Sequence, residues 1–512
     1  MTKELRLFPD VVLVGPDLEE RRGAALSIVD GVIAEIADAA ALRARPGDAE
    51  IISLPGQVVM AGFVNAHQHG RGITQFQLGF DDDVLEIWMP GLRRAGVLDL
   101  YCHTLLASLD MIAAGVTGVI HANTAYGLGD PAEEMRRTMR AYADSGLRAA
   151  VGVGLWDRSG TVYPASREPA FLASLPRELA VRIAARRPSF CAKADEAKAL
   201  MRLLRAECDT DRVHAAYAPA GPQWVSDELM AAALRDAADL GLIVHMHVAE
   251  SWVQYLTLRE LYPQGLLAHL AALGPVDERL SFGHAVWLGA GDADAAAARG
   301  VTFVRNAGSN LRLHAGVAPL AEYRRRGVRV AVGTDSFSLH ENEDILQELR
   351  LAGRLARAPQ WDGPAAPSPV EMIQMLTRGG AQAAGFGASA GLLIEGAPAD
   401  LVAIDLEGPR GAHVAPATAV TDLVYYRAGQ RDIRMTMVGG EILYRDGRHL
   451  RHDRDVVAAL AAEDVIRAAE AVAPQFHADV EALLPALQDH YAAYAREQNG
   501  NDAAWRALAD RA

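Results

Sequence analysis

Short apolar runs mark the first part of the chain, and Gly or Pro turn signals separate them. Runs of this kind between turn signals are typical of β-strands. They cover residues 11–14, 25–29, 32–36 and 51–54. The pattern predicts a small β-module that ends near Pro55-Gly56.

Apolar strands then alternate with helical segments, which is the pattern of parallel βαβ units. We count eight strand-like runs up to Asp335, the number that a closed (β/α)8 barrel requires. One run ends at Asn65, and the others cover residues 116–121, 149–154, 213–217, 242–247, 280–284, 301–304 and 328–333. The middle of the chain is therefore predicted to be an α/β fold of the TIM-barrel type.

Short β runs return after residue 391, and we expect them to pair with the first set. They cover residues 401–404, 419–425, 433–438 and 441–444. The tail at 455–498 is rich in Ala, carries Leu, Val and Ile at helical spacing, and is interrupted by Pro474 and Pro485. This predicts two or three amphipathic helices that pack against the body or against another subunit.

These elements predict four segments. They are a β-sandwich whose N-terminal part is 1–60, a catalytic barrel at 61–390, the C-terminal part of the sandwich at 391–450 and a helical tail at 451–512. Half of the 512 residues are hydrophobic and 22% are charged, a globular balance that can fill a sizeable core.

The net charge of -15 disfavours partners that carry phosphate backbones or anionic lipid surfaces. Residues 1–14 show no apolar segment behind basic residues, and no uncharged run reaches the roughly 18 residues that a membrane span needs. We expect a soluble cytoplasmic protein with no nucleic-acid or membrane partner. The three cysteines, Cys102, Cys191 and Cys208, suit neither a disulfide framework nor a CxxC metal site.

A histidine pair stands at the end of the first barrel run, in Asn65-Ala-His67-Gln-His69. Alternate residues of a strand face the same side, so both imidazoles can reach one metal ion. Taken alone, the pair is equally consistent with two surface histidines on a loop.

Three later runs also end in residues that bind metals or move protons. His245 and His247 end one run and are followed by Glu250, while His284 and Asp335 end two others. Singly, His284 could be a hydrogen-bonded structural residue, Glu250 a charge at a helix N-terminus and Asp335 a helix cap. Four such strand ends at the mouth where barrel enzymes have their active sites favour a functional site instead.

The motifs extend beyond these residues. In order they are PG at 55–56, GFVNAHQH at 62–69, LEIW at 85–88, HVAE at 247–250, HAVW at 284–287, SNL at 309–311, GTDS at 333–336 and GAPADLV at 396–402. Over most of residues 10–450 the chain resembles the amidohydrolase superfamily, in its branch of cytosine deaminases, guanine deaminases and triazine chlorohydrolases.

The resemblance implies that His67, His69, His247 and Asp335 hold one divalent metal ion, zinc in first place and iron as the alternative. Relatives with two metals bridge them with a carboxylated lysine at a barrel strand end. The only lysines here are Lys3, Lys193 and Lys198, and none stands at a predicted strand end. A single metal is therefore favoured.

The resemblance also implies proton-handling roles for Glu250 and His284, with Asp335 passing a proton to the leaving group. Hydroxide activated by the metal would attack a carbon of a C=N bond, and ammonia would leave. Trp88 is expected near the substrate mouth.

Further substrate contacts are expected from the loop at 70–83 and from the second barrel strand. Gln75 and His121 are the predicted contacts, with Arg71 and Gln77 as further candidates. All of these could equally be solvated or structural residues. Where many relatives have Cys-Pro or His-Pro before the SNL motif, this chain has Arg305-Asn306, a change whose effect the sequence does not reveal.

Three functions remain open at this point. The first is an aminohydrolase that acts on a small nitrogen heterocycle such as a pyrimidine, purine, pterin or triazine. The second is hydrolysis of an amide, urea, carbamate or carbon-halogen bond on the same scaffold, and the third is a barrel without catalysis. The retained Glu250 and His284 favour the first, with a small-molecule substrate and, by resemblance, a homo-oligomer.

Overall fold

The centre of the molecule is a sheet of eight parallel strands, whose order in space is also their order along the chain. The computed structural model describes residues 4–123, 130–186, 190–357 and 365–498. The strands are β6 (Phe63–Gln68), β7 (Val116–His121), β8 (Arg148–Leu155), β9 (Val213–Pro219), β10 (Val244–Val248), β11 (Leu280–His284), β12 (Thr302–Arg305) and β13 (Arg329–Val332). Each strand coincides with one of the predicted runs, so the predicted barrel is confirmed.

Residues that follow the last strand, β13, are hydrogen-bonded to the first strand, β6, and so close the barrel. The backbone N–H of Asp335 donates to the carbonyl of His67 at 2.8 Å, and that of His69 donates to the carbonyl of Asp335 at 2.9 Å. The last strand of the barrel therefore meets the first at the mouth where the predicted ligands stand.

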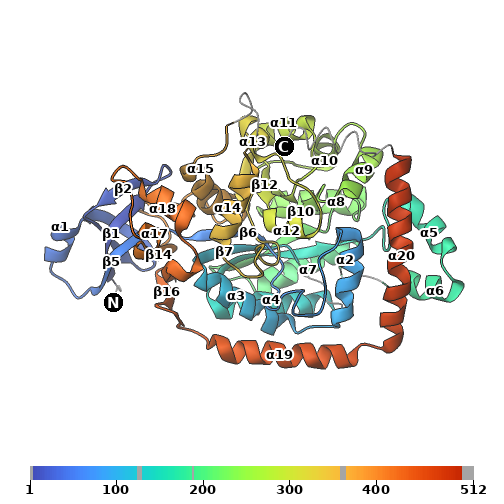
Figure 1. The fold of residues 1–512 in the computed structure, drawn as a ribbon, viewed down its shortest axis with the longest axis horizontal. Helices are drawn as coiled ribbons and strands as arrows, with labels where there is room; N and C mark the ends of the chain where they lie inside the picture. Colours follow the sequence, from blue (N-terminus) through green and yellow to red (C-terminus); the bar gives the residue numbers. More distant parts are fainter. Residues whose placement is uncertain (1–3, 124–129, 187–189, 358–364, 499–512) are drawn as a thin grey trace.

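Helices follow the strands and surround them (Figure 1). In chain order they are α2 (Leu85–Leu92), α3 (Leu100–Ala113), α4 (Pro131–Ser145), α5 (Glu168–Ser174), α6 (Arg177–Ala185), α7 (Ala194–Glu207), α8 (Asp227–Leu240), α9 (Trp252–Leu261), α10 (Leu266–Leu273), α11 (Ala290–Arg299), α12 (Ala307–Arg312), α13 (Leu320–Arg325), α14 (Ile345–Leu355), α15 (Pro369–Gln374) and α16 (Gly380–Ala383). Lys198 lies in α7, and Lys193 immediately precedes that helix.

Helix α2 continues into a short 3-10 turn, Arg93–Ala95, before α3 begins. Among the described residues no single helix is long and apolar enough to cross a membrane. The segments Leu85–Ala95 and Leu100–Ala113 meet that test only as a pair, by length and composition, and they are bent by 117°.

A second sheet combines strands from both ends of the chain (Figure 1). Its strands are β1 (Glu4–Val14), β2 (Glu19–Arg22), β3 (Ala24–Val29), β4 (Val32–Asp38), β5 (Glu50–Ala61), β14 (Leu401–Asp405), β15 (Ile433–Val438), β16 (Glu441–Arg445) and β17 (Arg448–His449). The two sets meet where β14 pairs antiparallel with β5, with Leu401 opposite Ala61. The expected pairing of the late β runs with the early ones is confirmed.

One predicted strand in this region is wrong. Residues 419–425 belong to a helix, α18 (Val420–Arg427), and not to a strand. The buried side chains Val420, Leu423 and Val424 stand at positions i, i+3 and i+4, which is the spacing of one helix face.

The tail consists of two long helices that lie along the barrel of the same chain (Figure 1). They are α19 (Arg454–Ala471) and α20 (Pro474–Glu497), and Pro485 lies inside α20 without ending it. Buried Asp464 of α19 lies 3.2 Å from His103 Nε2 on α3 and accepts from the backbone of Asp99. Residues 499–512 of the predicted tail lie outside the described residues.

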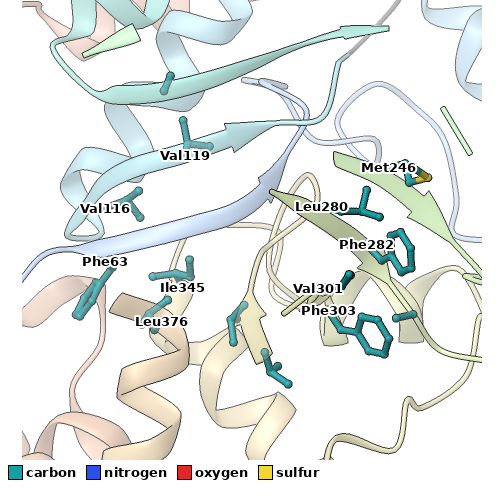
Figure 2. Packing of buried hydrophobic residues seen from close by; sticks show 14 of the residues in the cluster. Phe63, Val116, Val119, Met246, Leu280, Phe282, Val301, Phe303, Ile345 and Leu376 are labelled. Carbon is teal, nitrogen blue, oxygen red and sulfur yellow. The ribbon is translucent and has the colours of Figure 1, made fainter. Parts of the chain in front are cut away.

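The apolar core lies between the barrel strands and the helices. Phe282 of β11 and Phe303 of β12 stack there with ring centroids 5.8 Å apart. Figure 2 shows both side chains among the other apolar residues of this core. Small residues such as Ala150, Ala216 and Ala331 fill the opposite faces, inside the barrel. This alternation places Gly283, the neighbour of Phe282, on the inner face beside His67.

We predict that Phe282→Ala lowers the free energy of unfolding by about 3 to 5 kcal/mol, because it leaves a cavity in a close-packed core. Thermal unfolding followed by circular dichroism would measure the loss. Phe282→Leu is the matched control, since it removes fewer contacts and should cost clearly less. Equal losses in the two variants would show that the ring does not fill this core as described.

Candidate active site

The predicted metal ligands come together at one end of the barrel. Asp335 Oδ1 lies 3.3 Å from His67 Nε2 and 3.1 Å from His69 Nε2. His247 Nε2 lies 3.2 Å from His69 Nε2. One ligand atom each from His67, His247, His284 and Asp335 also fall within 4.8 Å of one another. The structure therefore brings together all four predicted ligands, with His284 beside them.

Each histidine of the predicted set is oriented by a bond to its other ring nitrogen. His69 Nδ1 lies 2.5 Å from the carbonyl of Asn123, and His247 Nδ1 lies 3.0 Å from that of Ala220. His67 Nδ1 lies 2.6 Å from His245 Nε2. Outer partners of this kind fix the ring and leave Nε2 for the centre of the site.

His245 is thus a supporting residue of His67. Its own Nδ1 is held by Ser281 Oγ at 2.7 Å, so a chain of three side chains ends at His67. Two glycines make room for the His67 ring. A Cβ on Gly283 would lie 2.9 Å from His67 Cε1, and one on Gly333 would lie 2.7 Å from His67 Cβ.

These residues fit a divalent metal by their chemistry. His67 Nε2 is buried and makes no hydrogen bond within the described part of the chain. Burial lowers the pKa of His69 and of His247, so both imidazoles are neutral and carry a lone pair. Burial works against the charge of Asp335, but its contacts with His67 and His69 hold the pKa of that carboxyl well below its usual range. Three imidazoles and one carboxylate are a donor set that zinc accepts.

A bridging lysine is not part of this set. Lys193 is exposed and its Nζ pairs with Glu196 at 2.7 Å, and Lys198 belongs to α7. Within the described residues no lysine stands at a barrel strand end.

Glu250 and His284 face each other beside the cluster. Glu250 Oε2 lies 3.5 Å from His284 Nε2, and both side chains are buried. Burial, followed by the charges of Asp335 and Glu86, raises the pKa of Glu250 well above its usual range. Burial lowers the pKa of His284 to about 3, and its Nδ1 is held by Asn310 Oδ1 at 2.9 Å. A carboxyl group with a raised pKa beside an imidazole with a lowered one suits proton transfer.

Arg305, which stands where many relatives have another residue, contacts the backbone of His284. Its side chain is 2% exposed, and Nη1 donates to the carbonyl of His284 at 2.7 Å. His284 and the following Ala285 have φ values of 67° and 48°, a conformation that L residues rarely adopt. The guanidinium thus holds the carbonyl of a strained strand end.

A cavity of about 560 Å³ opens above the cluster. Its inner end is lined by polar residues of the site, and its walls are largely aromatic or apolar. Its lining includes Arg71, Trp88, Arg93, Arg186, Val472 and Phe476. Val472 follows the last residue of α19 and Phe476 lies in the first turn of α20, so the tail forms part of the cavity wall.

The predicted substrate contacts differ in their positions. Trp88 lines this cavity. Gln75 is buried and lines a smaller adjoining space of about 20 Å³, together with Trp88 and Asp335. His121 is buried, with Nδ1 3.0 Å from the hydroxyl of Tyr142, and it does not line the cavity. Gln77 is exposed.

Sequence reasoning missed the outer part of the cavity. The helical spacing of the tail predicted packing, but nothing in that pattern says which surface the tail covers. Arg93 and Arg186 likewise belong to none of the motifs, and only the three-dimensional arrangement reveals them as cavity residues.

Known proteins resemble this chain over most of its length. The sequence profile described as the Amidohydrolase family matches residues 58–443. The chain is 29% identical over 469 residues to the 5'-deoxyadenosine deaminase of Methanosarcina mazei, and this match covers 89% of this chain and 96% of that protein. It is 27% identical over 449 residues to the 5-methylthioadenosine/S-adenosylhomocysteine deaminase of Nitratidesulfovibrio vulgaris, covering 85% and 90%.

Solved structures show the same fold. An adenosine deaminase from Xanthomonas campestris with bound zinc matches with a TM-score of 0.74 at 26% identity, covering 92% of this chain and 99% of that one. The atrazine chlorohydrolase of Arthrobacter aurescens, complexed with zinc, gives a TM-score of 0.74 at 20% identity, covering 90% and 100%. At that lower identity the likeness concerns the fold alone.

We predict that His247→Ala and Asp335→Asn each weaken metal binding by more than the roughly 10- to 100-fold typical for loss of an outer partner. Metal content after dialysis, measured by plasma mass spectrometry, should fall below one ion per chain. His340→Ala is the control, because this exposed histidine contacts Gln347 and not the cluster. Full metal content in both site variants would contradict the ligand assignment.

A second prediction concerns Glu348, which lies buried under the site and accepts from the backbone of Gly308 at 2.7 Å. Burial raises its pKa to about 8 from an ordinary 4.5. Between pH 4.5 and about pH 8 the carboxyl of Glu348 is ionised in the unfolded chain but protonated in the folded protein. The free energy of unfolding therefore falls as pH rises, by about 1.4 kcal/mol per pH unit.

Glu348→Gln keeps an acceptor for Gly308 and abolishes this titration. Relative to the wild type, the variant should gain stability progressively from pH 5 to pH 8, which a series of melting temperatures would measure. A difference between the two proteins that stays constant over this range would contradict the assignment.

Proposed function

Because the chain belongs to the amidohydrolase family, we propose that it is a metal-dependent aminohydrolase that releases ammonia from an aminated nitrogen heterocycle. The observation that carries this proposal is the pairing of Glu250 with His284, 3.5 Å apart, beside three histidines and an aspartate. Hydrolysis of a ring C–N bond needs a carboxylic acid that can donate a proton, next to side chains that can bind a metal ion.

The proposed metal site holds one ion, and zinc is the proposed metal. His67, His69, His247 and Asp335 would be the ligands. A divalent ion in such a site lowers the pKa of a bound water molecule from 15.7 towards about 7 and so supplies a nucleophile at neutral pH.

The protein's own side chains would move the protons. Glu250 gives its proton to the ring nitrogen next to the carbon that bears the amino group, and that carbon becomes electrophilic. His284 holds the attacking water through Nε2. The carboxylate of Asp335 would take one proton from this water and pass it to the amino group, which leaves as ammonia when the C–N bond breaks. As the carbonyl bond forms on the same carbon, the second proton of the water would return to Glu250 and restore the acid.

The proposed substrates are heterocycles of nucleoside size. The relatives named above are deaminases of 5'-deoxyadenosine and of 5-methylthioadenosine or S-adenosylhomocysteine. A cavity of about 560 Å³ with an indole wall at Trp88 can enclose a molecule of this size and stack on its ring. 5'-Deoxyadenosine is therefore the first compound to test.

We predict that Glu250→Gln keeps its metal and loses about 10²- to 10⁴-fold in kcat, the usual contribution of a general acid. Release of ammonia from 5'-deoxyadenosine and from a panel of aminopyrimidines, pterins and triazines measures the rate, and plasma mass spectrometry checks the metal. Full turnover in this variant would remove Glu250 from the mechanism. Product formation without ammonia would point instead to hydrolysis of another bond.

A further inference from the structure

Arg71 is a buried cation in the wall of the cavity. It follows His69 and Gly70, is 8% exposed, and lines the cavity next to the metal-type cluster. Its Nη1 donates to Ser336 Oγ, the residue after Asp335, and its guanidinium carbon lies 5.4 Å from the centroid of the Trp88 ring. The guanidinium is thus fixed between the aromatic wall and the inner end of the cavity.

In the part of the chain that the structure describes, no carboxylate lies within ion-pair distance of the Arg71 guanidinium. Within the described residues Arg71 forms no ion pair, and its buried Nε makes no hydrogen bond. The two acids of the site have other contacts. Asp335 lies against His67 and His69 and accepts from Ser309, while Glu250 faces His284. A buried cation without a counterion is costly, so this arrangement requires a reason.

Other cations line the same cavity at its outer end. Arg93 belongs to the turn after α2, and Arg186 packs on Phe476 at 4.3 Å and pairs with Asp479 at 2.8 Å. The chain as a whole carries a net charge of -15, yet three arginines gather around one cavity with mostly apolar walls. Such a cavity attracts an anion and disfavours a cation.

We propose that Arg71 binds a carboxylate carried by the heterocyclic ring of the substrate, an inference that rests on the proposed function and narrows its substrate class. A planar guanidinium binds a carboxylate through two parallel N–H groups, and Ser336 and Trp88 hold it in place for that task. A group attached to the ring, rather than to a distant arm, fits because Arg71 lies at the inner end of the cavity. Arg93 and Arg186 lie at the outer end, where an arm would extend.

The test compares substrates that differ only in charge. Pterin-6-carboxylate and cytosine-5-carboxylate are each paired with the corresponding carboxamide, and 5'-deoxyadenosine serves as a neutral reference. Ammonia release gives kcat and KM for each compound. Titration calorimetry with the Glu250→Gln variant gives the affinity for each compound without turnover.

The expected result is a preference for the carboxylate of at least about tenfold in kcat/KM and in affinity for at least one pair. Arg71→Met should reduce this ratio to about one, mainly through KM, while Arg71→Lys should keep part of it. Arg93→Met is the matched control and should keep the preference. If Arg71→Met does not fold, Arg71→Gln and Arg71→Lys provide the comparison.

Three results would overturn the proposal. One is a wild-type enzyme that shows no preference for the carboxylate in any pair. Another is an Arg71→Met variant that loses activity and affinity equally for both members of a pair, as a purely structural role requires. The third is loss of the preference in Arg93→Met but not in Arg71→Met, which would place the anion at the outer end.

The same experiments distinguish a failure of the proposed function from a failure of the proposed role of Arg71. If no compound releases ammonia, including 5'-deoxyadenosine, the aminohydrolase assignment fails. The calorimetric preference for a carboxylate, and its loss in Arg71→Met, would still decide the binding role of Arg71.

Discussion

The junction between Asp335 and the first barrel strand is the constraint on which the site depends. Its backbone joins the last strand to the first through bonds to His67 and His69, and its carboxylate lies between the imidazoles of the same two residues. The contacts that close the barrel therefore also bring these site residues together. The positive φ of Asp335, 67°, is tolerated because its backbone N–H and carbonyl are both hydrogen-bonded to the end of β6, at His67 and His69.

Other buried polar residues hold the histidines beside this junction in place. His245 and Ser281 support His67, Asn310 supports His284, and Arg305 holds the carbonyl of His284. These supports come from three neighbouring strands, β10, β11 and β12, and from helix α12. The precision of the site therefore rests on the barrel as a whole, and a side chain one layer away from the chemistry can still determine the geometry.

The sequence predicted the barrel and the convergence of its ligands because both follow local rules. Apolar runs alternate with helical segments, and parallel strands end at one mouth, so residues at strand ends such as His67 and Asp335 must lie close together. The same local rules misassigned α18, because a short apolar run fits a strand and a helix face equally. The environment of Arg71 and the outer wall of the cavity depend on contacts between distant segments, which no local pattern encodes.

The turn between α19 and α20 has a consequence for biosynthesis. Val472 and Phe476 close the outer wall of a cavity whose inner end begins at His69, about four-fifths of the chain earlier. A ribosome releases the barrel strands long before it releases this turn, and domains generally fold as they emerge. A nascent barrel would therefore present its catalytic end open to solvent, and the enclosed binding space would form only when synthesis is nearly complete.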